Sequence, residues 1–426
     1  MMEWNVQVDG KQILNGYVTS LEVAPQQTVS ISLGYNAEDI KEAAGLEDLS
    51  DVDVYLNVKY VLRKSDGLLP AGFQVAYDQI AANVAEQEKF DGSSIAGLPE
   101  YSQNGSLHTF SGIMTYDGVG VNRYDKWKIV FDAEKGALIS YTLAGKPMVA
   151  NALMPCFGRA VNENDLGAKL EKRLADWLYP EFKVNSFDVK VETNCYNITV
   201  TYAPLQIKTI NDKKKPVECT ANVSLAFKVY ADGTVEGLEK LTDGGNLNAA
   251  IMIPRFGMEF AMPGEYSVFE FYGKGPFENY CDRNSAAMTG HYVQRVEDQY
   301  HWGYARPQES GTKTQLRWIR LADENGTGLM ITSDVKFSAS ALPLSRRQLD
   351  LSITGGGRSE HGDQRHSLEL KKLACENMRS HGKTYINFDL MQTGVATVNS
   401  WGALPRPEHR VKGEQEFRFI IRPIDN

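Results

Sequence analysis

The segment ANVSLAFKVYADGTVEGLEKL (residues 221–241) indicates the fold class of this chain. Apolar and polar residues alternate on both sides of Asp232-Gly233, and such alternation places every second side chain on one buried face of a strand. Asp-Gly between two alternating runs is the strongest short signal for a tight antiparallel turn. The segment therefore predicts a β-hairpin.

The same alternation recurs along the chain. It is found in DVDVYLNVKY (51–60), in KWKIVFD and ALISYTL around the turn AEKG (126–143), and in EFRFIIRPI (416–424). Helix-forming composition is confined to residues 37–49, 78–90 and 166–179, which we interpret as short helices or loops. We therefore expect an all-β protein.

Breaks in the alternation suggest two domains. Residues 1–88 hold enough strand signals for a small antiparallel sandwich of immunoglobulin-like size. The Gly-, Ser- and Pro-rich stretch FDGSSIAGLPEYSQNGS (90–106) predicts a linker over residues 89–106. Residues 107–426 continue as strands without a comparable break, which predicts one very large antiparallel sandwich.

Composition narrows the function classes. The chain has 426 residues, and Lys plus Arg number 45 against 54 Asp plus Glu, a formal net charge of −9. Nucleic-acid binding depends on basic side chains, so no nucleic-acid partner is expected. No run of 18 apolar residues occurs, so no membrane span is expected. The five cysteines are scattered and form no ligand pattern, and we expect neither a metal site nor a bound cofactor in this chain.

The first twelve residues, MMEWNVQVDGKQ, lack a basic and apolar leader, so no signal peptide is expected in this chain. This leaves the compartment open between the cytoplasm and the periplasm of a bacterium.

Four polar, turn-rich stretches stand out as candidate sites. They are CFGRAVNENDLG (156–167), FEFYGKGPFENYCDRNSAAMTG (269–290), HWGYARPQESG (301–311) and TVNSWGALPRPEHR (397–410). Clustered Asn, Asp and Arg suit sugar hydroxyls, and they equally suit ordinary loops closed by side-chain hydrogen bonds. Trp401 lies in a Gly- and Pro-containing loop, where an aromatic face is available for stacking on a sugar ring. No catalytic pair is evident from these residues alone.

Taken in order, five segments resemble the C-terminal region of family 2 glycoside hydrolases of the large β-galactosidase type. They are FGRAVNENDLGA, YGKGPFENYCDR, YARPQESGTKTQLRWIRL, FSASAL and MQTGVATVNSWG. The sequence departs from the family pattern at Val161-Asn162-Glu163, at Ser310 and at Asn399. Residues 1–88 resemble the immunoglobulin-like domain that precedes this region in the family.

The resemblance implies a supersandwich related to galactose mutarotases for residues 107–426. It also implies that a separate (β/α)₈ barrel carries the two catalytic glutamates of a retaining mechanism, together with Mg and Na ions. A barrel needs about 250 residues of alternating strand and helix, and no such stretch occurs here. The chain alone is therefore expected to be inactive, with the barrel of the same or a partner chain and a β-galactoside as its partners. A homo-oligomer is also compatible with the sequence.

The resemblance assigns roles to individual residues. Trp401 matches the family tryptophan that stacks on the sugar. Arg159, Asn164 and Asp165 match patterned positions and are candidates for substrate contact or for locking their loop. Structural or interface roles are expected for six further residues, namely Glu278, Asn279, Asp282, Arg283, Arg306 and Glu309.

Two other functions remain open. The supersandwich is shared with aldose 1-epimerases, although no epimerase motif is found. A noncatalytic carbohydrate-binding module that uses Trp401 as a platform is the second alternative.

Overall fold

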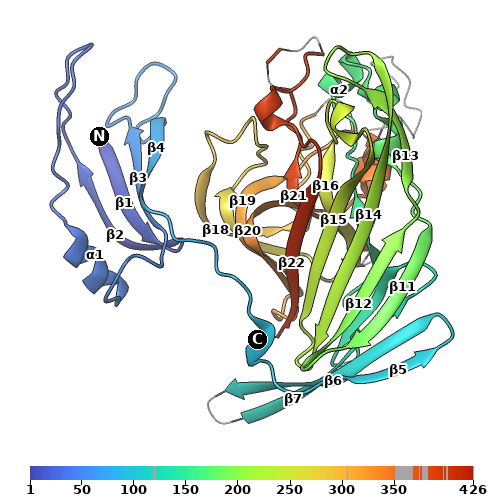
Figure 1. The fold of residues 1–426 in the computed structure, drawn as a ribbon. Helices are drawn as coiled ribbons and strands as arrows, with labels where there is room; N and C mark the ends of the chain where they lie inside the picture. Colours follow the sequence, from blue (N-terminus) through green and yellow to red (C-terminus); the bar gives the residue numbers. More distant parts are fainter. Residues whose placement is uncertain are drawn as a thin grey trace. The chain divides into compact units, whose positions relative to one another are not determined.

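The computed structural model describes residues 1–118, 121–304, 306–350, 368–373, 375–376, 382–396, 398–399 and 402–425 (Figure 1). They form two compact units. The smaller comprises Met1–Gln87, Tyr272–Pro276 and Ser285–Tyr292, and the larger comprises Glu88–Phe271, Phe277–Asn284 and Val293–Asn426. Antiparallel strands dominate both units, so the all-β prediction is confirmed.

The smaller unit contains a four-stranded sheet in the order β2-β1-β3-β4 and one helix. Its elements are β1 (Met2–Val8), β2 (Lys11–Val18), α1 (Ala37–Ala44), β3 (Val54–Val61) and β4 (Gln74–Asn83). Asn36 caps α1 through a reciprocal pair of hydrogen bonds with Asp39, and Gly45 ends the helix at φ 69°. Val6, Val54 and Ile40 form the core of this unit.

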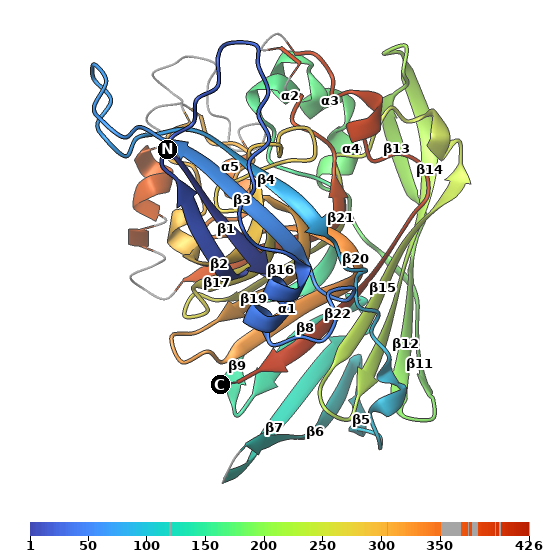
Figure 2. The same cartoon turned by 90° about the vertical axis from the view of Figure 1, so that its left-hand side faces the viewer.

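The larger unit is one curled antiparallel sheet of 18 strands, β5 to β22 (Figure 2). Successive pairings run β11-β12-β14-β15-β22-β20-β21-β16-β10-β8-β7-β6-β5. Figure 1 shows β12, β14, β15 and β22 side by side, as this order requires. Strands β17 and β18 contribute residues to both units.

The strands of the large sheet have the following bounds. The first nine are β5 (Glu100–Asn104), β6 (Leu107–Gly118), β7 (Val121–Asp132), β8 (Ala137–Leu143), β9 (Lys146–Pro147), β10 (Asn151–Cys156), β11 (Val184–Val191), β12 (Cys195–Tyr202) and β13 (Leu205–Ile210). The other nine are β14 (Pro216–Tyr230), β15 (Val235–Gly245), β16 (Arg255–Pro263), β17 (Val268–Gly275), β18 (Met288–Arg295), β19 (Lys313–Ala322), β20 (Gly328–Leu342), β21 (Lys383–Gln392) and β22 (Gln415–Ile424).

Both sequence-predicted hairpins of this unit form. β14 and β15 meet at a turn in which the Thr234 N–H donates to Asp232 Oδ1 at 2.9 Å and Gly233 takes φ 87°. β7 and β8 meet at Gly136, whose φ is 65°. L side chains rarely adopt these angles, which is why glycine occupies both turns. The strand predicted over 416–424 is β22.

Helices are short and few among the described residues. The stretch 166–179 contains the end of α2 (Glu163–Gly167) and the whole of α3 (Leu170–Arg173) and α4 (Ala175–Leu178), while α5 (Arg346–Leu349) follows β20. The 3₁₀ helices are η1 (Gly92–Ser94), η2 (Leu247–Ala249), η3 (Val296–Asp298) and η4 (Pro407–His409). The interpretation of 78–90 as a helix is wrong, because residues 78–83 belong to β4, which pairs with β3.

The stretch predicted as a linker, 89–106, contains η1 and β5, and β5 pairs with β6. The exact domain boundaries stay predictions. No helix in the described ranges is long and apolar enough to cross a bilayer.

Candidate functional site

A four-residue segment after β21 is held by hydrogen bonds from several parts of the larger unit. We call this segment, Thr393 to Ala396, the clamped segment. It leads toward the loop that carries Trp401. Trp401 itself lies outside the described residues, as do residues 397 and 400, so the structure does not place the predicted stacking residue.

The first side of the clamp comes from Arg159. Its guanidinium binds Asp165 through two hydrogen bonds, Nε to Oδ2 at 3.0 Å and Nη2 to Oδ1 at 2.8 Å. The same guanidinium donates to the carbonyl oxygens of Thr393 and Gly394. Both side chains of the ion pair are almost fully buried. Arg159 thus ties its own loop to the clamped segment.

Local sequence explains how Asp165 is positioned. Asn162 begins α2, its side chain accepts from the Asp165 N–H at 2.8 Å, and the Asp165 carboxylate accepts from the Asn162 N–H at 3.1 Å. This reciprocal cap fixes the first turn of the helix. One carboxylate therefore caps a helix and pairs with Arg159.

Asn164 and Asp282 bind the clamped segment at its far end. The Asn164 amide donates to the carbonyl oxygens of Val395 at 3.1 Å and Ala396 at 2.8 Å. The Asp282 carboxylate accepts from the N–H groups of the same two residues, at 3.0 Å and 2.9 Å. Ala396 has φ 62°, a conformation that needs such support in a residue other than glycine.

Glu278 closes the turn that carries Asp282. One carboxylate oxygen accepts from Arg283 at 2.6 Å and from the Tyr304 hydroxyl, and the other accepts from Ser310 Oγ and the Gly311 N–H, both at 2.8 Å. Burial works to raise the pKa of Glu278, but these hydrogen bonds and Arg283 hold the pKa below its ordinary value. Ser310, a departure from the family pattern, is thus a hydrogen-bond donor here.

Asn279 attaches the turn to β19. Its Oδ1 accepts from the N–H of Thr314 at 3.1 Å and from the Thr314 hydroxyl at 2.5 Å, and its own N–H donates to the carbonyl oxygen of Thr312 at 2.7 Å. Its side chain is fully buried. Arg306, by contrast, makes a looser ion pair with Glu163 at 3.9 Å, with both side chains partly exposed.

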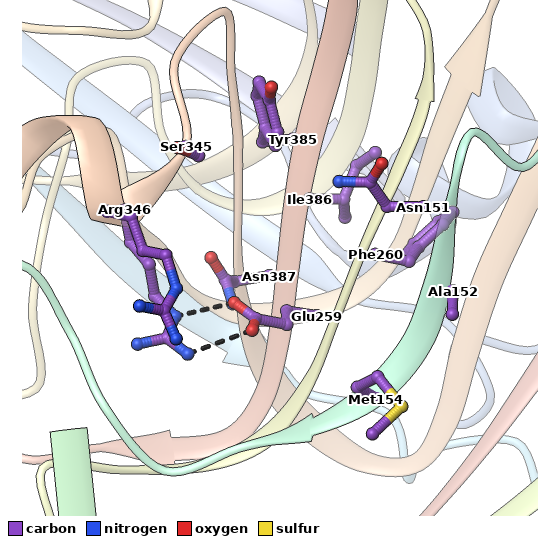
Figure 3. Close-up of a pocket in the computed structure, with 11 residues that line it drawn as sticks. Asn151, Ala152, Met154, Glu259, Phe260, Ser345, Arg346, Tyr385, Ile386 and Asn387 are labelled. Carbon is purple, nitrogen blue, oxygen red and sulfur yellow. Dashed lines mark hydrogen bonds and ion pairs between the residues drawn. The ribbon is translucent and has the colours of Figure 1, made fainter. Parts of the chain in front are cut away.

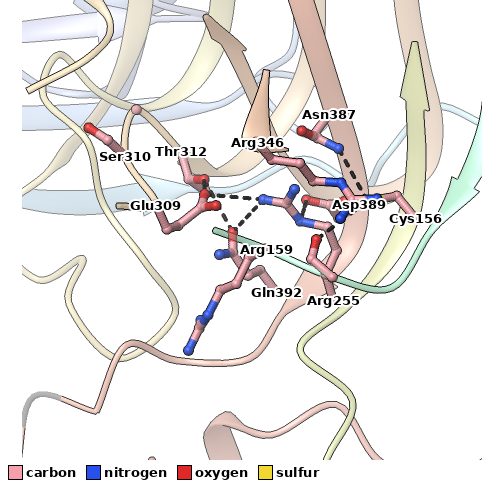
Figure 4. Close-up of polar contacts among 12 residues, drawn as sticks. Cys156, Arg159, Arg255, Glu309, Ser310, Thr312, Arg346, Asn387, Asp389 and Gln392 are labelled. Atoms are coloured by element: carbon pink, nitrogen blue, oxygen red, sulfur yellow. Dashed lines mark hydrogen bonds and ion pairs between the residues drawn. The ribbon is translucent and has the colours of Figure 1, made fainter. Parts of the chain in front are cut away.

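A buried ionic network lies beside the clamp, centred on Arg255 (Figure 4). Its guanidinium is 3.2 Å from Glu309 Oε1 and 3.1 Å from Asp389 Oδ2, and it donates to Gln392 Oε1 at 3.0 Å. Thr312 donates to Glu309 at 3.0 Å. Glu309 was a sequence candidate, whereas Arg255, Asp389 and Gln392 were missed.

This network holds more carboxylates than cations. Burial raises the pKa of Asp389 to about 8 against the opposing effect of Arg255, because Glu309 already shares that guanidinium. Glu239 on β15 is fully buried, and its carboxyl oxygens have no hydrogen-bond partner among the described residues. Burial and the nearby Asp389 raise the pKa of Glu239 well above its ordinary value.

A cavity of about 300 Å³ opens on the adjacent strands β10, β16 and β21 (Figure 3). It is lined by Asn151, Ala152, Met154, Glu259, Phe260, Ser345, Arg346, Arg347, Tyr385, Ile386 and Asn387. Its one carboxylate, Glu259, is bound by Arg346. In the part of the chain that the structure describes, no group of three or more His, Cys, Asp or Glu side chains could hold a metal ion.

Two family models and two curated relatives that match this chain all carry the name beta-galactosidase. The family model described as beta galactosidase small chain matches residues 123–421, and the one described as beta-galactosidase, domain 4, matches residues 1–83. The chain is 25% identical over 425 residues to a beta-galactosidase of Priestia megaterium, covering 99% of this chain and 36% of that protein. It is 24% identical over 401 residues to one of Halalkalibacterium halodurans, covering 94% and 34%. The chain thus spans about a third of the length of these relatives.

Among solved structures, a galactose 1-epimerase from Lactobacillus acidophilus aligns with a TM-score of 0.32 at 6% identity. The alignment covers 74% of this chain and 99% of that chain. A TM-score this low carries no functional inference.

Proposed function

The chain belongs to the β-galactosidase small-chain family, and from this premise we propose that it is the accessory part of a family 2 β-galactosidase. In this proposal, a catalytic (β/α)₈ barrel of the same or a partner chain hydrolyses terminal β-galactosides with retention. The present chain supplies one wall of the sugar site through Trp401. Any Mg or Na ions belong to the barrel.

The clamped segment is the observation that carries the proposal. Arg159, Asn164 and Asp282 bind backbone groups of all four of its residues, and these side chains come from two stretches that are both far from the segment in sequence. An aromatic ring stacks productively on a sugar only when its loop is held in one orientation, because ordering a free loop costs conformational entropy. The clamp provides such an anchor directly before the loop of Trp401.

The carboxylates of the buried network and of the cavity are not available as a catalytic pair. A retaining glycosidase needs two carboxyl groups about 5–5.5 Å apart that reach the substrate. Glu239, Glu309 and Asp389 are 0%, 7% and 1% exposed, and are therefore inaccessible to a sugar. Glu259 reaches a cavity, but both of its oxygens are engaged by Arg346.

Two assays test the proposal. The purified chain should release no nitrophenol from nitrophenyl β-galactoside above buffer, and a catalytic part supplied in trans should restore turnover. Hydrolysis by the chain alone would contradict the accessory role. Faster interconversion of galactose anomers by the chain alone would favour the epimerase alternative, although the cavity lining contains no histidine.

Variants of the reconstituted enzyme then test whether Trp401 contributes to the sugar site. Trp401→Ala should lower kcat/KM about tenfold or more, since an aromatic ring in contact contributes about 1 kcal/mol beyond its buried area. Asp282→Ala should lower kcat/KM in the same direction by releasing the two N–H groups it binds. Val191→Ala, at an exposed position on β11, is the matched control and should change nothing. Unchanged kinetics for Trp401→Ala would remove this residue from the sugar site.

A further inference from the structure

The cavity of Figure 3 is built on three paired strands of the large sheet. Met154, Glu259 and Asn387 are register partners on the adjacent strands β10, β16 and β21, so they form one row across the sheet. The next row carries Asn151 and Tyr385. The segment Ser345 to Arg347, at the start of α5, forms the wall. Sites built on strands hold their side chains more precisely than sites on loops.

The polar groups of the cavity suit a hydroxylated molecule. Asn151, Tyr385 and Asn387 place amides and a hydroxyl around the space, whereas the Ser345 hydroxyl is hydrogen-bonded to Gln348. Phe260 and Ile386 add apolar surface. Hydroxyl groups both donate and accept, so a mixed lining of this kind can satisfy several of them. A volume near 300 Å³ is at the lower end of the roughly 300–1,000 Å³ typical of ligand pockets, which favours a ligand of monosaccharide size.

The charges of the cavity are fixed by two neighbouring arginines. Arg346 donates to both oxygens of Glu259, from Nε at 2.6 Å and from Nη2 at 2.9 Å, so these two charges neutralise each other. Arg347 lines the same cavity and has no carboxylate partner among the described residues. The charged side chains that line the cavity therefore sum to one positive charge.

Tyr179 holds the unpaired guanidinium in place. The Cζ atoms of Arg346 and Arg347 lie 4.3 Å and 4.2 Å from the centre of its ring. The Tyr179 hydroxyl is fixed in turn by a 2.7 Å hydrogen bond to Asp350. A stacked guanidinium loses little further freedom when it binds an anion, and its planar fork matches a carboxylate.

We propose that this cavity binds a small polyhydroxylated carboxylate of the size of a hexuronate, with its carboxylate on Arg347 and its hydroxyls on Asn387 and Asn151. The proposal goes beyond the accessory role above and does not depend on it. The site would lie in the larger unit and would be separate from the loop of Trp401 in sequence.

Isothermal titration of the purified chain with sodium galacturonate, galactose and inorganic phosphate tests the proposal. Galacturonate should bind saturably, galactose about tenfold more weakly because it lacks the charge-assisted hydrogen bonds, and phosphate should not compete. Arg347→Ala should weaken galacturonate binding about tenfold without changing the weak binding of galactose. Arg63→Ala, an exposed arginine of the smaller unit, is the matched control and should leave both affinities unchanged.

Several results would overturn the proposal. No binding of galacturonate, or equal affinity for galactose and galacturonate, would remove the carboxylate from the assignment. Competition by phosphate at similar concentration would show a general anion site without sugar recognition. Because Arg347 is exposed, its variant should fold normally, and circular dichroism verifies this. Asn387→Ala supplies a second variant, and unchanged binding would contradict the role of this amide.

Discussion

Replacing Arg159 with Met should strongly destabilise the larger unit. The substitution leaves Asp165 almost fully buried without its bidentate partner and removes the donors to the carbonyl oxygens of Thr393 and Gly394. Breaking a buried ion pair by removing one partner costs about 3–5 kcal/mol. Because Asp165 keeps only the Asn162 N–H, we expect the free energy of unfolding to fall by an amount within that range. Urea denaturation followed by circular dichroism measures this change.

Two further variants distinguish the loss of the Arg159–Asp165 ion pair from the general effect of replacing an arginine. Arg295→Met removes a surface pair with Glu324, whose side chains are 41% and 69% exposed, and should cost about 0–1 kcal/mol. The double variant Arg159→Met with Asp165→Leu should cost less than the sum of the single variants, since residues in contact couple by about 0.5–3 kcal/mol. If Arg159→Met were no more harmful than Arg295→Met, the clamp would not contribute to stability as argued.

Three other predictions follow from the buried network. The raised pKa of Asp389 means that the folded state holds a proton which the unfolded state has lost, so stability should fall as pH rises from about 4 to about 8. Asp389→Asn should reduce this fall, as measured by urea denaturation at pH 5 and pH 8.5. An equal fall in the free energy of unfolding for the variant and the parent chain would refute the assignment. Glu239→Gln should likewise reduce the loss of stability as pH rises above about 4.5, because the raised pKa of Glu239 makes the folded state hold a proton that the unfolded state loses. Thermal unfolding at pH 5 and pH 9 tests it, and an unchanged difference between the two melting temperatures would contradict it. Gly257→Ala should lower the melting temperature by several degrees, because a Cβ there would lie 2.4 Å from the Asp389 Cα atom; an unchanged melting temperature would show that the sheet relaxes freely.

The fold was predictable where the signal was local. The Asp232-Gly233 hairpin depends on residues adjacent in sequence, and its turn chemistry is readable directly. The stretch 78–90 was ambiguous because its composition favours a helix, whereas pairing with β3 draws its first part into a strand. Strand propensity depends on such neighbours, which a single segment does not reveal.

The sequence motifs of the candidate site could be predicted, but the residues elsewhere in the chain that pair with them could not. Asn162 and Asp165 form a cap within four residues, and the turn around Glu278 and Asp282 is also compact in sequence. Arg255 and Asp389 belong to no motif, and 133 positions separate them. One signal was present, because a charged residue inside an apolar strand, such as Arg255 in IMIPRFGMEF (251–260), is rarely buried unless it is paired.

The contacts of the clamped segment bear on how this chain would complete a sugar site in the proposed accessory role. Arg159, Asn164 and Asp282 all bind main-chain atoms of this segment, so its backbone path is fixed whatever side chains it carries. All of these groups belong to the larger unit itself. In the accessory role proposed above, the anchor before Trp401 would therefore be supplied by this chain alone, and association with a catalytic part would not have to supply its entropy cost. An accessory part that is ordered in advance in this way can complete a sugar site without contributing a reacting group.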